Sequence, residues 1–140
     1  MTTTLTRPDH PAARSALASR RFWFGADAVV TGTNGLVYLA AAGALVDLLG
    51  GDAGTWRAVG AFLLVYAAGV ALYARSPRSA RAGWAIVVAN TLWVVASLDV
   101  AVTGALDLDP VGRGWVVAQA VVVASFVLLQ ARVLRARLQA

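Results

Sequence analysis

Residues 22–49 read FWFGADAVVTGTNGLVYLAAAGALVDLL, an apolar run in which Asp27 and Asp47 are the only charged side chains. The run exceeds the ~20 residues that an α-helix needs to cross the hydrocarbon core of a bilayer. Apolar residues occupy both parities along it, whereas a membrane β-strand alternates apolar and polar side chains. The run therefore predicts a membrane-spanning helix, with extra length that tilts or protrudes at its outer end.

Three more apolar runs follow, and short polar connections separate them. The connections are a Gly-rich turn at 50–54, a basic segment at 75–81 with Pro77 as a helix stop, and a turn at 107–112. The sequence therefore predicts an all-α fold, a four-transmembrane-helix bundle of two hairpins. The expected spans are about 22–49, 56–74, 82–106 and 114–131 within a transmembrane domain at 21–135, flanked by a disordered tail at 1–20 and a short basic end at 132–140.

The arginines predict the orientation of the bundle. Ten of them lie in the N-terminal tail, the 75–81 connection and the C-terminal end, whereas the other two connections hold only Arg57 and Arg113. Positive residues stay on the cytoplasmic side, so we expect both termini in the cytoplasm (N-in/C-in). All basic residues are Arg and all acids are Asp, a codon bias typical of high-GC bacteria. We therefore expect a multi-pass protein of the bacterial cytoplasmic (inner) membrane.

Composition excludes several classes of function. The chain is 59% hydrophobic and only 14% charged, against about a quarter charged in soluble domains. Its net charge of +5 is explained by Arg beside apolar spans, so we expect contact with lipid headgroups and no nucleic acid. There is no Cys, and the only His is His10 in the tail, which removes thiol chemistry, Ser-His-Asp catalysis and bis-histidine haem. We expect no enzymatic activity, no metal and no cofactor.

Polar residues in the first span share one helix face. Asp27, Thr31, Asn34 and Tyr38 follow one another at intervals of four, three and four residues, which stacks them along one side of a helix. This polar seam predicts a ligand pocket or a protonatable site at Asp27, or else hydrogen bonds between helices. For Asp27 we prefer the structural interpretation, in which it reaches Arg20, Arg21 or headgroup water, because it lies near an interface.

Two further spans contribute side chains of the same kind. Asn90, Trp93 and Ser97 share a face of the third span, and the fourth carries Gln119 and Gln130. Mid-membrane amides predict a shared polar core of Asn34, Asn90 and Gln119, either as interhelical contacts, which we prefer, or as a binding site. Trp93 is expected in the core or in a pocket wall. The candidate binding residues are Asp27, Thr31, Asn34, Tyr38, Asn90, Trp93 and Gln119.

The pattern Asp27-x(3)-Thr31-Gly32-x-Asn34-Gly35-Leu36-x-Tyr38, with Asn90-x-x-Trp93 and the helix carrying both Gln residues, resembles a group of four-span bacterial, actinobacterial-type membrane proteins without an assigned activity. The resemblance covers about residues 22–135 and implies only the fold. Size and span count are also similar to the small multidrug-resistance transporters and the fluoride channels. The chain lacks the membrane-embedded Glu of the first family and the pore motifs of the second.

Two functions agree with these patterns. The first is a non-enzymatic binding or accessory bundle, which holds a lipid-like ligand or a partner helix in the polar seam. The second is a small oligomeric transporter or channel that uses the Asp27/Asn34/Asn90 seam. We prefer the first, because a single acid near the interface is thin support for a transport cycle. The expected partners are the lipid bilayer and either further copies of the chain or another membrane protein.

Overall fold

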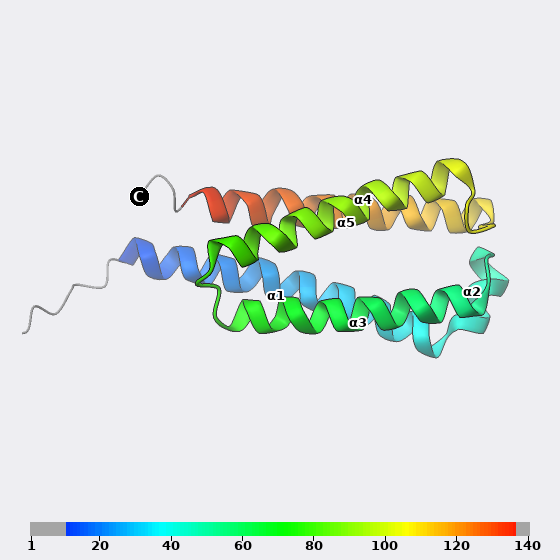
Figure 1. Cartoon of the computed structure of the whole chain (residues 1–140), viewed down its shortest axis with the longest axis horizontal. Coiled ribbons are helices and arrows are strands. Elements are labelled where there is room, and N and C mark those ends of the chain that lie inside the picture. Colours follow the sequence, from blue (N-terminus) through cyan, green and yellow to red (C-terminus); the bar gives the residue numbers. More distant parts are fainter. Residues whose placement is uncertain (1–10, 137–140) are drawn as a thin grey trace, which may run out of the picture.

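The computed structural model describes residues 11–136, and within this range the chain is all-helical, as predicted (Figure 1). Three of its helices are long and apolar enough to cross a membrane, and the first two qualify together as a fourth span if the bent pair counts as one. The five helices are α1 (Pro11–Ala40), α2 (Ala42–Leu49), α3 (Ala53–Arg75), α4 (Ala80–Thr103) and α5 (Pro110–Arg135).

The first expected span differs from the structure at both ends. The helix α1 begins at Pro11, so residues 11–20, which we assigned to a disordered tail, are helical; residues 1–10, including His10, lie outside the described residues. The chain also breaks at Ala41, and the axes of 18–40 and 42–49 meet at 92°. The run 22–49 therefore forms a bent pair of helices and not one continuous helix.

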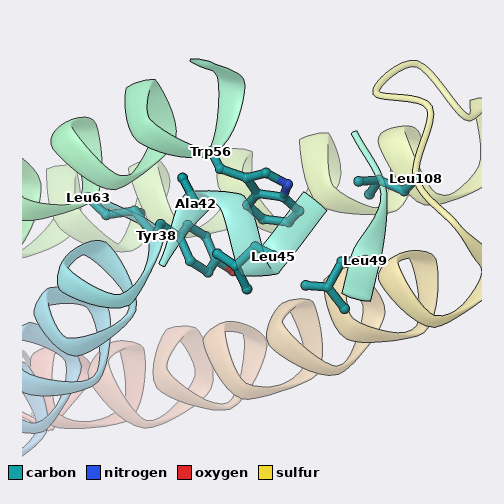
Figure 2. Close-up of a cluster of buried hydrophobic side chains, with 7 residues drawn as sticks. All are labelled: Tyr38, Ala42, Leu45, Leu49, Trp56, Leu63 and Leu108. Atoms are coloured by element: carbon teal, nitrogen blue, oxygen red, sulfur yellow. The ribbon is translucent and has the colours of Figure 1, made fainter. Parts of the chain in front are cut away.

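The bend lets α2 bury apolar side chains against the loop end of the bundle, which is the end opposite to the start of α1 and the end of α5. Figure 2 shows Leu45 and Leu49 from α2 close to Tyr38, Trp56 and Leu108. Burial of a Leu side chain contributes about 1.5–3 kcal/mol in water, which favours the folded-back position of α2.

The helix ends agree with the predicted turns. Asp52 caps α3, because its carboxylate accepts a hydrogen bond from the backbone N–H of Thr55 (2.9 Å), and the Ser79 hydroxyl accepts one from Ala82 (3.2 Å) at the start of α4. The helix α3 ends at Arg75, two residues before Pro77. Pro110 opens α5 at a position where no backbone N–H is required.

The helices pack as two antiparallel pairs, α1 with α3 and α4 with α5 (Figure 1). In the first pair the backbones approach closely at Gly35 and Gly60. A Cβ on Gly60 would lie 2.8 Å from the Gly35 carbonyl oxygen, and a Cβ on Gly35 would lie 2.9 Å from that of Gly60. Only glycine permits this approach. The predicted small-residue step from Ala28 to Gly32 is looser, since a Cβ on Gly32 would meet Ala67 at 3.5 Å.

Backbone hydrogen bonds join the two pairs at the loop end. Gly51 donates to the carbonyl of Asp107 (3.1 Å), and Asp109 donates to the carbonyl of Leu49 (2.9 Å). Gly50 and Gly51 adopt positive φ angles of 78° and 76°, which glycine tolerates without strain.

A buried arginine joins the pairs at the terminal end. Arg20, on α1, is 1% exposed. Its guanidinium donates hydrogen bonds to the carbonyls of Val133 (3.3 Å) and Leu134 (3.4 Å) on α5, and to Pro77 in the α3–α4 connection (3.4 Å). The two pairs of helices are therefore fastened to each other at both ends.

Candidate functional site

A cavity of about 530 Å³, here called the central cavity, lies between the two helix pairs. It is within the size range of small-molecule sites. Four of its apolar or aromatic lining residues are well exposed, namely Val30, Phe62, Trp115 and Val122. The cavity therefore reaches the surface of the bundle, which in a membrane faces acyl chains. Its lining residues are Val30, Thr31, Asn34, Phe62, Leu63, Tyr66, Ala89, Asn90, Trp93, Trp115, Ala118, Gln119, Val122 and Val123.

A buried polar cluster closes the cavity toward the terminal end. Asp27 is 0% exposed. One carboxylate oxygen accepts a hydrogen bond from the Thr31 hydroxyl (3.1 Å), and the other accepts from the amides of Asn90 (2.8 Å) and Gln130 (2.7 Å). Asn90 also donates to the side-chain oxygen of Gln130 (3.2 Å). We call Asp27, Thr31, Asn90 and Gln130 the Asp27 cluster; it joins α1, α4 and α5.

The cluster continues into the aromatic wall of the cavity through Tyr66. The Tyr66 hydroxyl donates to the Asn90 side-chain oxygen (2.9 Å). Phe62, one turn away on α3, lies nearly parallel to Tyr66 and to Trp93, with ring centroids 6.2 Å and 5.8 Å apart. The wall is thus a row of three rings from α3 and α4.

A second polar group lies at the other end of the central cavity. The Tyr38 hydroxyl accepts hydrogen bonds from the indole N–H of Trp115 (2.9 Å) and from the Gln119 amide. These bonds join α1 to α5 at Tyr38, which lies about three turns after Asp27 on α1. Tyr38 itself is 3% exposed.

A second, smaller cavity of about 220 Å³ adjoins this group and extends to the loop end. It shares Trp93 and Gln119 with the central cavity, and Gly51 and Asp52 line its far side. We call it the loop-end cavity. Ser97, which is 8% exposed, also lines it.

Asn34 differs from the other amides of the bundle. It lines the central cavity, yet its side chain forms no hydrogen bond with any residue that the structure describes. Inside a membrane an amide without a partner is costly, because lipid offers neither donors nor acceptors. Asn34 therefore has hydrogen-bonding capacity free for a molecule in the cavity.

The structure places the predicted residues in three groups. Asp27 lines neither cavity, but it accepts hydrogen bonds from Thr31 and Asn90, which line the central cavity. Tyr38 lines the loop-end cavity. The expected shared core of Asn34, Asn90 and Gln119 is not formed as such, because Asn90 bonds within the Asp27 cluster, Gln119 bonds to Tyr38, and Asn34 bonds to neither. Thr31, Asn34, Asn90, Trp93 and Gln119 all line the central cavity.

Three residues of the site were missed or misplaced by the sequence argument. Tyr66 sits four residues after Phe62, a spacing that could have shown a second polar-aromatic face on α3. Gln130 was noted only for its alignment with Gln119. Arg20 was expected as a possible partner of Asp27, whereas its guanidinium donates to backbone carbonyls at the terminal end.

No protein-family model, no curated protein and no solved structure matches the chain. Among the described residues, no group of three His, Cys, Asp or Glu side chains is placed to hold a metal ion. The geometry of the cavities and of the Asp27 cluster is therefore the basis for the function argued below.

Proposed function

We propose that the chain is a non-enzymatic binding bundle of the bacterial cytoplasmic membrane, which holds a lipid-like molecule in the central cavity. In this proposal α1 and α2 together form the first of four crossings, and both termini lie in the cytoplasm. The excess of Arg in the tail, the 75–81 connection and the C-terminal end supports this orientation. The apolar helices support multi-pass insertion.

One observation carries the proposal: Asn34 lies in an apolar cavity with no hydrogen-bond partner among the described residues. Its neighbours Asn90 and Gln119 are held by other side chains of the bundle. Structural contacts between helices thus account for those two amides but not for Asn34. A ligand with a polar head and an apolar tail satisfies the amide and fills the cavity together.

The test is native mass spectrometry of the protein released gently from its membrane. We expect the wild type to carry one bound mass, which Asn34→Leu loses. Thr33→Val is the matched control, because Thr33 is the neighbouring polar residue on α1 but is exposed and does not line the cavity. A wild type that is released without any bound mass would contradict the proposal. Loss of the mass in both variants would show that its binding does not depend on Asn34 specifically.

A transporter or channel is the second candidate, and one observation favours it. The central and loop-end cavities adjoin at Trp93 and Gln119, so together they extend from the Asp27 cluster to the loop end. A pore predicts flux in proteoliposomes that Asp27→Asn abolishes while the fold is kept. A binding bundle predicts no flux. A bare, closed oligomer in the mass spectrum would favour the pore.

A further inference from the structure

Three polar residues at the Asp27 end of the central cavity, Thr31, Tyr66 and Asn90, have a common directionality. The single hydroxyl proton of Thr31 is donated to Asp27, and that of Tyr66 is donated to Asn90. Both amide hydrogens of Asn90 are donated as well, to Asp27 and to Gln130. What these three residues have left for a ligand is therefore the lone pairs of their oxygen atoms.

The charge nearest to the cavity has the matching sign. Both side-chain oxygens of Asp27 accept hydrogen bonds from Thr31, Asn90 and Gln130, and neither donates one to a described residue, which is the pattern of a carboxylate. Among the described residues it forms no ion pair, and no charged side chain lines the central cavity. The one charged residue that lines the adjoining loop-end cavity is another acid, Asp52.

The opposing charge is placed on the far side of Asp27. Arg20 precedes Asp27 by seven residues on α1, which is about 10 Å along the helix axis. Its guanidinium points to the carbonyls of Pro77, Val133 and Leu134 at the terminal end. The negative side of this arrangement faces the cavity. The aromatic wall of Phe62, Tyr66 and Trp93 adds electron-rich rings, which favour cations.

We propose that the ligand of the central cavity is a cationic amphiphile, with a protonated amine or another cationic head group next to Thr31, Asn90 and Tyr66 and its apolar tail directed to the lipid. This inference rests on the proposed function, since it names the class of molecule that the same cavity holds. The acceptor oxygens and the carboxylate behind them select against an anionic head. An uncharged head of the same size is intermediate.

The test compares three amphiphiles that share one chain and differ in the charge of the head: decylammonium, decanol and decanesulfonate. Binding to the purified full chain is measured by titration calorimetry in an uncharged detergent, with protein-free micelles subtracted. A charge at roughly 8 Å from Asp27 in a partly polar interior changes Kd by at least about tenfold. We expect decylammonium to bind at least about tenfold more tightly than decanesulfonate, with decanol between them.

Asp27→Asn retains the shape of the side chain and removes its charge, so we expect it to bring the three affinities together. Asp99→Asn is the matched control, because Asp99 is an exposed acid on α4 that lines neither cavity; it should leave the preference unchanged. The preference should also persist in high salt, whereas one caused by exposed acids would fade by screening.

The wild type alone tests the proposal even if Asp27→Asn does not fold. Equal binding of all three amphiphiles, or tighter binding of decanesulfonate, overturns the cationic assignment. If that equal binding is still lost in Asn34→Leu, the proposed function stands and only the ligand class is wrong. A failure of the proposed function is recognised separately, by a wild type released from its membrane without any bound mass.

Discussion

Asn34 and Asn90 are two amides in the same cavity, and replacing each with Leu separates structural from binding roles. Asn90 takes part in three hydrogen bonds, to Asp27 (2.8 Å), to Gln130 (3.2 Å) and from Tyr66 (2.9 Å). Asn34 takes part in none with the described residues. We expect Asn90→Leu to lower the free energy of unfolding and Asn34→Leu to leave it nearly unchanged.

The size of the effect follows from the partners. Hydrogen bonds between neutral side chains in a membrane contribute about 0.6 kcal/mol each on average. A hydrogen bond to a charged group contributes about 1.5–3 kcal/mol. The bond that Asn90 donates to Asp27 is of this kind. Leu has the same branching and number of side-chain heavy atoms as Asn and is larger, so the substitution leaves no void. Asn90→Leu should therefore destabilise the bundle by about 3–4 kcal/mol, and Asn34→Leu by less than about 1 kcal/mol.

Both variants are measured by reversible unfolding in mixed micelles of a mild detergent and dodecyl sulfate, followed by helical circular dichroism. Asn34→Leu should lose the bound mass without losing stability, and Asn90→Leu should lose stability. Equal destabilisation of the two variants, or a stable Asn90→Leu, would refute the division into a structural cluster and a free cavity amide.

Three further predictions concern the scaffold. Gly60→Ala should destabilise the α1–α3 pair by about 1–3 kcal/mol through overpacking. Gly69→Ala is the control and should have no such effect, because a Cβ at Gly69 would meet nothing within 4 Å. Melting temperatures in detergent measure both effects. Arg20→Leu should lower the free energy of unfolding by several kcal/mol, at about 1–3 kcal/mol for each buried carbonyl left unpaired. The exposed Arg21→Leu should leave it nearly unchanged. Cysteine-accessibility mapping should show the same topology for both variants, because each removes one positive charge. Hydrogen bonds from Thr55 lower the pKa of Asp52, so its stabilising cap on α3 is present at neutral pH and is lost as pH falls through that lowered pKa. Amide-exchange protection factors at the start of α3, which are corrected for the intrinsic pH dependence of exchange, should fall in acid in the wild type and be low at all pH values in Asp52→Ala.

The sequence was sufficient for the helices and their connections, because each depends on local features. The apolar runs are long enough for a bilayer, Pro77 stops a helix, and the turn at 50–51 uses two glycines with positive φ. These features act within a few residues of the chain, so they are visible without knowledge of the neighbouring helices.

The partners of the polar residues were not predictable in the same way, because they depend on how far each helix is shifted along its neighbours. With the first helix expected to begin at Phe22, Asp27 seemed close to an interface. The helix begins at Pro11, which places Asp27 about four turns from its first residue. There its carboxylate accepts hydrogen bonds from Asn90 and Gln130. The sequence thus identified most of the polar residues, but it did not show which of them face one another across the helices.

The fastening of the two helix pairs at both ends limits how a molecule can enter between them. The loops are joined by the bonds from Gly51 and Asp109, and the terminal end is joined through Arg20. With both ends held, a separation of the pairs would be largest at mid-length, where the central cavity already reaches the surface of the bundle. In a membrane such an opening would face the acyl chains. Exchange with the central cavity would then proceed sideways, within the plane of the membrane, and its rate would depend on the thickness and lateral pressure of the surrounding lipid.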